Sequence, residues 1–341
     1  MPPGQYNLAL VWLKFGLCAA LIAVAGYRLS RYGDIIAEKT GLGRTLVGLV
    51  LIATVTSLPE LVTGVSAVAL AHSPDIAIGN VLGACGMNLA MIVVLDFLQR
   101  GPSVYTRVSH GHILAAGFSL ILIGIVGFSV LVETRAATPA LAHVGLYSPL
   151  LAALYVFAMR TQFSYERRQI IARIEEGAAR YPGVTLQQAA LGYTAAAAVV
   201  VGAALWLPFV AEELAAVMGW RKTFVGTVLV AFATTLPEMA VTVSALRLGA
   251  LDMAIGNLFG SNLFNIAIVA VDDLFYTEGP ILAHVSSQHA VTALSAIVMT
   301  GIAIIGLLYR PAGRMLGTVT WASLLLLLVY LLNTYVLYLH G

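Results

Sequence analysis

Ten long apolar runs are the feature that most restricts how this chain can fold. About 20 apolar residues are enough for a helix to cross the hydrocarbon core of a bilayer. Runs of roughly this length occupy residues 7–28, 44–71, 75–98, 111–132, 140–159, 188–216, 223–248, 252–275, 288–309 and 315–338. Many links between them are short, and they lack the alternation of polar and apolar residues that marks a barrel strand. The sequence therefore predicts an all-α membrane protein with ten transmembrane helices.

The composition leads to the same class. Only 10% of the 341 residues are charged and 60% are hydrophobic, whereas a soluble domain carries about 25% charged residues. The net charge of +2 is too small to indicate a nucleic-acid partner. The expected partners are the lipid bilayer and transported cations, and no feature of the sequence specifies an oligomeric state.

The distribution of basic residues predicts an orientation. Fourteen of the 18 Lys and Arg residues fall in links on one side of the ten runs, and positive charge marks the cytoplasmic side. Both termini are then expected outside the cytoplasm. The longest polar link, which has an amphipathic pattern over residues 163–183, lies on the cytoplasmic side as a solvated linker or a contact for anionic lipid. Without a large cytoplasmic domain, the chain fits a prokaryotic inner membrane.

An internal repeat divides the chain into two halves. With an offset of 178 residues, segment 43–60 matches segment 221–238 at ten identical positions, and with an offset of 177, segment 75–88 matches 252–265 at seven. Five runs per half is an odd number, so the second half enters the membrane from the opposite face. The sequence therefore predicts two inverted five-helix repeats, residues 1–160 and 188–341, joined by a cytoplasmic linker over 161–187.

Each half carries a proline and a glutamate inside an apolar run. Pro59 and Pro237 have no N–H group, and their rings crowd the carbonyl four residues earlier. Each helix is therefore expected to bend or unwind and to leave carbonyl oxygens unpaired near Val55 and Ala233. At membrane depth such groups are costly unless they line a cavity or bind something, and a cation would satisfy them.

Glu60 and Glu238 supply matching negative charge. A carboxylate at membrane depth costs at least about 2.5–3.5 kcal/mol and marks a functional candidate. The repeat is expected to bring the two together, where they bind a proton or a cation. Carboxylates, hydroxyls and carbonyls suit Na⁺ or Ca²⁺. A purely structural role, with hydroxyls satisfying the proline bends, would explain one copy better than two. Asn88 and Asn265 are expected to face the site, whereas Cys85 is interpreted as a packing residue and the nearby glycines as helix contacts.

These motifs resemble a known family. TSLPE followed by GNVLGACGMN, and TTLPE followed by GNLFGSNLFN, are similar to the two repeats of the cation/calcium antiporter superfamily, and most similar to its Na⁺/Ca²⁺ exchanger branch. The resemblance implies alternating access, with the first and sixth spans sliding across a fixed core. It also implies a set of cation ligands: Glu60 and Glu238 at the centre, the backbone carbonyls of Thr56 and Thr234, the hydroxyls of Ser57, Thr235 and Ser261, and the amides of Asn88 and Asn265.

The sequence departs from the family pattern at four positions. Val55 and Ala233 stand where the family has glycine, Ala84 replaces a serine, and Asn265 stands where many relatives have an acid. The centre then holds two acids, whose charge of −2 balances one Ca²⁺ or two Na⁺. Because Ala84 has no hydroxyl, we expect one Na⁺ site to be weakened, so that the exchanger uses fewer Na⁺ per cycle, couples to protons, or prefers another ion.

The expected function is secondary antiport, most directly Na⁺ inward for Ca²⁺ outward, and the alternative is proton-coupled export of Ca²⁺ or another cation on the same fold. No cofactor is expected. An intramembrane enzyme with paired carboxylates is less consistent with symmetric acids that lack a nucleophile, and a channel would conduct without a counter-ion gradient.

Two groups of polar residues outside the repeat motifs receive weaker interpretations. His110 and His112 are interpreted as interfacial histidines, with a metal-binding or pH-sensing role as the alternative. Asp272, Asp273 and Glu278 are interpreted as a solvated acidic loop on the outer side.

Overall fold

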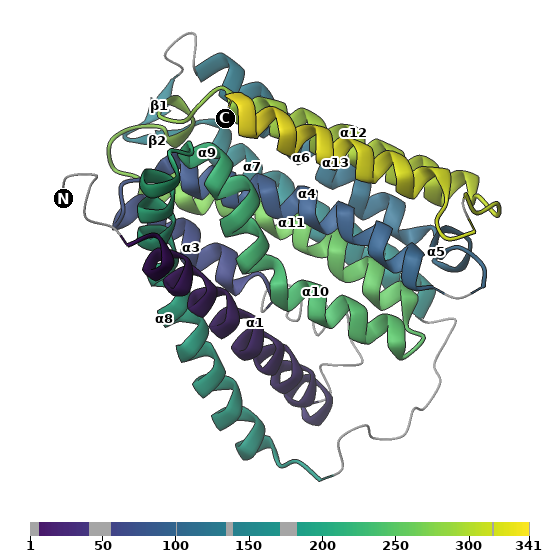
Figure 1. The fold of residues 1–341 in the computed structure, drawn as a ribbon. Helices are drawn as coiled ribbons and strands as arrows, with labels where there is room; N and C mark the ends of the chain where they lie inside the picture. Colours follow the sequence, from purple (N-terminus) through teal and green to yellow (C-terminus); the bar gives the residue numbers. More distant parts are fainter. Residues whose placement is uncertain are drawn as a thin grey trace.

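Long helices packed side by side make up nearly all of the protein (Figure 1). The computed structural model describes residues 7–40, 56–99, 101–133, 139–170, 183–315 and 317–340. The helices of the first half are α1 (Leu8–Lys39), α3 (Leu58–Ala69), α4 (Pro74–Leu98), α5 (Val104–Arg107), α6 (Gly111–Glu133) and α7 (Tyr147–Ile170). Those of the second half are α8 (Leu186–Met218), α9 (Lys222–Phe224), the π-helix η2 (Val225–Val230), α10 (Ala231–Arg247), α11 (Leu251–Phe275), the 3₁₀ turn η3 (Ile281–Ala283), α12 (Gln288–Tyr309) and α13 (Trp321–His340).

Eight helical stretches of the described chain are long and apolar enough to cross a membrane, so the prediction of a helical, multi-pass membrane protein is confirmed. They are α1, α4, α6, α8, the continuous stretch Lys222–Arg247, α11, α12 and α13. α3 is a shorter apolar helix, and the first part of the predicted run 44–71 lies outside the described residues.

Two predicted boundaries are wrong. The run 140–159 begins with a two-stranded hairpin, β1 (Ala140–Leu141) and β2 (Val144–Gly145), and helix α7 starts only at Tyr147. The run 315–338 begins with turns, and helix α13 starts at Trp321. Glycine and proline between residues 311 and 317 explain the second difference, because both interrupt helices. The predicted linker also starts late: α7 continues to Ile170, and residues 171–182 lie outside the described chain.

α4 and α11 form the centre of the bundle (Figure 1), and they are the most buried of the eight stretches. Glycines let α4 approach its neighbour closely, because a Cβ on Gly83 would lie 2.1 Å from the carbonyl oxygen of Thr227 in η2. Gly226 of η2 lies equally close to Ile76 of α4, where a Cβ would be 3.0 Å from backbone atoms. The predicted backbone-to-backbone packing is confirmed for this pair of elements.

α1 and α8 lie together at the edge of the bundle (Figure 1). Lys14 Nζ of α1 donates to Glu213 Oε2 of α8 at 2.6 Å, so a salt bridge links the two helices. α8 in turn rests on α3. Pro208 removes the N–H that would bond the carbonyl of Ala204, and the Thr63 hydroxyl of α3 donates to that carbonyl at 3.4 Å.

Gly26 is the contact point between α1 and α10, and it provides a test of this packing. A Cβ on Gly26 would lie 2.3 Å from Cγ of Pro237, so Gly26→Ala must push the two helices apart. Overpacking of this kind costs about 1–3 kcal/mol, and we expect a clearly lower midpoint of thermal unfolding in detergent. Gly16→Ala, on the same helix with no atom within 4 Å of its Cβ position, is the matched control. Equal unfolding midpoints for the two variants would contradict this packing.

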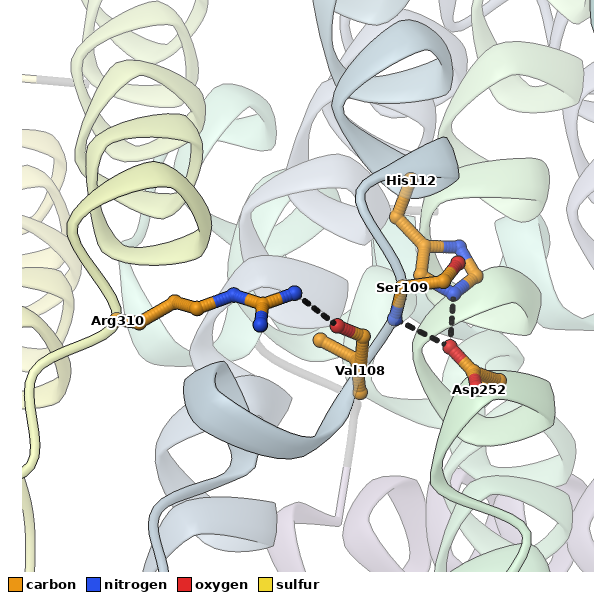
Figure 2. Close-up of polar contacts among 5 residues, drawn as sticks. All are labelled: Val108, Ser109, His112, Asp252 and Arg310. Atoms are coloured by element: carbon orange, nitrogen blue, oxygen red, sulfur yellow. Dashed lines mark hydrogen bonds and ion pairs between the residues drawn. The ribbon is translucent and has the colours of Figure 1, made fainter.

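A histidine and a carboxylate join α6 to α11 (Figure 2). Asp252 Oδ1 accepts hydrogen bonds from the backbone N–H of Ser109 at 2.7 Å and from His112 Nε2 at 3.0 Å. Beside it, Arg310 Nη2 donates to the carbonyl of Val108 at 3.3 Å. His112 is therefore a buried structural residue, and the interpretation of it as an interfacial histidine is wrong.

The same arrangement recurs in the other half at an offset of 177 residues. Asp75 Oδ1 of α4 accepts from the backbone N–H of Ser286 at 2.7 Å and from His289 Nε2 of α12 at 3.0 Å. Each of the two aspartates thus ties a central helix to a helix of the other half of the sequence. The alignment of Asp75 with Asp252 extends the repeat to contacts that the motifs alone do not indicate.

The ends of α4 and α11 are also held by matching carboxylates. Asp96 accepts from Thr320 and Ser323 at the start of α13 and from the backbone N–H of Val104. Asp273 accepts at corresponding places from Gly145 N, Tyr147 Oη, Ser148 Oγ and Ile281 N. The predicted solvated acidic loop is therefore wrong for Asp272 and Asp273, which are both 0% exposed within α11.

Candidate functional site

Glu60 and Glu238 lie buried in the middle of the bundle and exchange hydrogen bonds with the opposite half of the chain. Ser57 Oγ donates to Glu238 Oε1 at 3.0 Å, and Thr235 Oγ1 donates to Glu60 Oε1 at 3.3 Å. Both carboxylates are 0% exposed. Since Ser57 and Thr235 are counterparts in the repeat, as are the two glutamates, the contacts are reciprocal. Each hydroxyl therefore positions the glutamate that belongs to the other half.

The two prolines act differently from the expected bends. Pro59 lies in the first turn of α3, which begins just after Ser57, and a missing N–H is tolerated in a first turn. Pro237 lies inside α10, which runs without interruption from Ala231 to Arg247. The irregular backbone comes earlier, in the π-helix η2, a geometry that is frequent at functional sites. An unwound helix at Pro237 is therefore wrong, and Val55 lies outside the described residues.

Asn80 of α4 joins the two glutamate-bearing helices. Its Nδ2 donates to the backbone carbonyl of Glu60 at 3.2 Å, and its Oδ1 accepts from Thr234 Oγ1 at 2.9 Å. This amide therefore fixes the start of α3 against α10. Its counterpart Asn257 instead donates to Thr242 Oγ1 at 3.2 Å. Thr56, the partner of Thr234 in the repeat, is buried beside the carboxylate of Glu238.

α4 and α11 meet at a second pair of amides. Asn88 Nδ2 donates to Asn262 Oδ1 at 3.0 Å, and Asn262 Nδ2 donates to the carbonyl of Cys85 at 3.3 Å. Asn265, predicted to face the site, is 0% exposed, and neither its Nδ2 nor its Oδ1 has a hydrogen-bond partner in the described chain. Ser261 Oγ lies one helical turn away on the same helix and is likewise buried without a partner there.

The unpaired oxygens define what the site can hold. In the described part of the chain, five buried side-chain oxygens from the predicted ligand set have no hydrogen-bond donor, and they are Glu60 Oε2, Glu238 Oε2, Asn88 Oδ1, Ser261 Oγ and Asn265 Oδ1. No cluster of three or more His, Cys, Asp and Glu side chains occurs among the described residues. The set is therefore two carboxylates with neutral oxygens, a donor set that suits a hard cation such as Na⁺ or Ca²⁺.

Ala84 occupies the position where a further oxygen is missing. Its side chain is 0% exposed, and Ser261 is its counterpart in the other half. The two sides of the site therefore differ by one hydroxyl group.

Asn262 is a site residue that the sequence analysis missed. Its counterpart in the first half is Cys85, so a search for identical positions passes over it. The available signal was an amide three residues before Asn265, close to one helical turn away on the same side of α11.

Comparisons with known proteins support a single family. Residues 10–164 and 189–339 match the family described as sodium/calcium exchanger protein. The inner membrane protein YrbG of Escherichia coli is 27% identical over 295 residues, which cover 85% of this chain and 87% of that protein. The sodium/calcium exchanger MaX1 of Methanosarcina acetivorans is 28% identical over 281 residues, covering 71% and 76%.

Solved structures show the same fold. An H⁺/Ca²⁺ exchanger, CAX, has a TM-score of 0.72 at 13% identity, over 96% of this chain and 85% of that one. The sodium-calcium exchanger NCX_Mj, in crystals soaked with Na⁺ and Sr²⁺, has a TM-score of 0.60 at 23% identity, over 96% and 99%. With the family match extending over most of its length, the chain is an integral membrane protein that belongs to the sodium/calcium exchanger protein family.

Proposed function

We propose that this protein exchanges Na⁺ for Ca²⁺ across the membrane and that Glu60 and Glu238 bind the transported ion. The reciprocal hydrogen bonds between the halves, which leave one oxygen free on each glutamate, carry the proposal. Two negative charges balance one Ca²⁺ or two Na⁺. Family membership and a relative named as a sodium/calcium exchanger support it.

The remaining ligands in the proposal come from both halves. The carbonyls of Thr56 and Thr234 complete the central site, and Ser57, Thr235 and Ser261 serve flanking Na⁺ sites. Asn88 and Asn265 close the centre. In this scheme, ten helices form two inverted five-helix repeats, residues 1–160 and 188–341, with both termini outside the cytoplasm.

Alternating access would come from the paired helices α1 and α8. The Lys14–Glu213 salt bridge joins them at 2.6 Å, which favours movement as one unit. Gly26 against Pro237 and the Thr63 contact to α8 place this unit beside both glutamate-bearing helices. Sliding of the pair would open the site first to one face of the membrane and then to the other.

Proton-coupled exchange is the second candidate, and the similarity to the fold of an H⁺/Ca²⁺ exchanger favours it. Uptake of labelled Ca²⁺ into proteoliposomes separates the two candidates. An outward Na⁺ gradient without a pH gradient is compared with an acid interior without Na⁺. Uptake driven by Na⁺ supports the proposal, and uptake driven only by the pH gradient replaces it with the second candidate. Absence of Ca²⁺ flux in both conditions would contradict Ca²⁺ antiport.

Ala84→Ser tests the weakened Na⁺ site. The added hydroxyl would supply the oxygen that the first half lacks, and a net contribution of about 0.5–1.5 kcal/mol corresponds to roughly a two- to tenfold gain in Na⁺ affinity. The Na⁺ concentration for half-maximal Ca²⁺ uptake should fall accordingly, and the reverse change Ser261→Ala should raise it. A wild-type Hill slope near that of a three-Na⁺ exchanger, or no effect of Ala84→Ser, would contradict the weakened site.

A further inference from the structure

Asp272 is a buried carboxylate outside the set of ligands described above. It lies near the end of α11, is 0% exposed, and neither of its oxygens has a hydrogen-bond partner in the described chain. The adjacent Asp273 takes the four local donors, so none of the N–H and O–H groups at this end of α11 bonds Asp272. An isolated buried carboxylate without donors or a counter-ion is costly in its charged form.

The surroundings of Asp272 leave little space for a metal ion on the side of α3. A Cβ on Gly64 would lie 2.6 Å from both carboxylate oxygens, so the backbone of α3 is directly against them. A proton, unlike Na⁺ or Ca²⁺, needs no additional volume.

Other charged groups on the elements around α11 do not pair with Asp272. Glu60 on α3, Asp75 on α4, Glu133 on α6 and Glu238 on α10 are acids, and none of them donates to its oxygens in the described structure. α7 contributes Tyr147, which donates to Asp273 instead. The negative charge of Asp273 opposes ionisation of its neighbour. These surroundings favour a protonated Asp272 in this conformation.

The position of Asp272 connects it to the proposed ion site. Gly64 is one helical turn beyond Glu60 on α3, about 6 Å along the helix axis. Asp272 is seven residues beyond Asn265 on α11, which places the two side chains on one face about 10 Å apart. A cation that travels between Glu60 and the membrane face where α3 ends would therefore pass close to Asp272.

The repeat has no second copy of this group. At the offset of 177 residues the counterpart of Asp272 is Leu95, and the counterpart of Gly64 is Thr242. The carboxylate is therefore specific to one half, whereas Asp273 matches Asp96. Asn265 also lacks the charge that many relatives carry there, and Asp272 supplies one acid two turns further along the same face.

We propose that Asp272 is a proton-binding site of the transport cycle, separate from the central glutamates, and that its proton is a coupling ion exchanged for the divalent cation. This inference rests on the proposed function as a Ca²⁺ antiporter. When the proton leaves to water, the carboxylate attracts the incoming cation toward Glu60. When the cation has passed, reprotonation removes the buried charge.

Asp272→Asn tests the proposal because the amide resembles the protonated acid in shape and removes no hydrogen bond. In proteoliposomes with an acid interior, we expect wild-type Ca²⁺ uptake to fall at least tenfold in Asp272→Asn. Ca²⁺ self-exchange, which needs no net proton movement, should be retained. Glu278→Gln is the matched control, since this acid follows α11 and its side chain is 56% exposed.

Two outcomes overturn the proposal: no uptake driven by the pH gradient in the wild type, or unchanged uptake in Asp272→Asn. If Ca²⁺ self-exchange is absent from the wild type, the proposed antiport itself fails. The carboxyl band in infrared difference spectra between acid and alkaline pH then decides the inference separately. A protonated-carboxyl band that is lost in Asp272→Asn supports a removable proton on this residue, and an unchanged band contradicts it.

Discussion

Glu60→Gln and Glu238→Gln should each abolish Ca²⁺ exchange. The amide keeps the shape of the side chain and can still accept the hydrogen bond from Thr235 or Ser57, so the bundle should assemble normally. Removing one unit charge at about 4 Å from a cation removes about 4 kcal/mol at an effective dielectric constant near 20. This corresponds to a loss of roughly a thousandfold or more in affinity for a divalent ion. The measurement is Ca²⁺ self-exchange in proteoliposomes.

The control for these variants is Glu278→Gln, which removes an acid of the same type from the surface. Its self-exchange should equal that of the wild type. Activity within about tenfold of wild type in either Glu60→Gln or Glu238→Gln would show that the paired carboxylates do not bind the transported ion. Unequal effects, with one variant inactive and the other normal, would contradict a site shared by both halves.

Asp273→Ala should have the largest effect on stability. Its carboxylate accepts four hydrogen bonds at buried positions on β2, α7 and the start of η3, at 2.9 Å from Gly145 N, 2.9 Å from Tyr147 Oη, 2.5 Å from Ser148 Oγ and 2.7 Å from Ile281 N. A buried donor left without a partner costs about 1–3 kcal/mol, so four of them give a loss of at least about 4 kcal/mol. We expect little folded protein, and a strongly lowered thermal midpoint for what is recovered in detergent.

The neighbouring Asp272→Asn provides a sharp comparison for Asp273→Ala. Asp272 has no hydrogen-bond partner in the described chain, so its amide variant should unfold at the wild-type temperature or above it. Two adjacent aspartates in one helix would then differ completely in their effect on stability. A normal thermal midpoint for Asp273→Ala would contradict the structural role assigned to it.

Much of the helical architecture is readable from the sequence because the bilayer sets the length of each element. The predicted run 288–309 coincides with α12, and the runs 111–132 and 252–275 differ from α6 and α11 by one residue. The prediction fails at run 140–159, where apolar residues form a hairpin before α7 starts. Hydropathy alone does not distinguish an apolar turn from the first turn of a helix.

The repeat also indicates which side chains meet in the candidate site. Aligning Glu60 with Glu238 and Ser57 with Thr235 predicts that the two halves contribute equivalent groups, and the structure places each hydroxyl on the glutamate of the other half. Asn262 could not be found in this way, because its counterpart is a cysteine.

The different environments of Asp272 and Asp273 could not be read from their adjacent positions either. Side chains one residue apart point about 100° apart on a helix. One therefore meets the donors around β2 and α7, and the other meets Gly64 of α3. Which face receives which neighbour depends on how helices distant in sequence pack together.

Ca²⁺ binding to the purified protein tests the central role of the paired glutamates most directly. Calorimetric titration in detergent should give one Ca²⁺ per chain, an apparent affinity that falls as Na⁺ is added, and no measurable binding in Glu60→Gln or Glu238→Gln. Ca²⁺ binding that persists unchanged in both variants would place the ion elsewhere and contradict the proposed site.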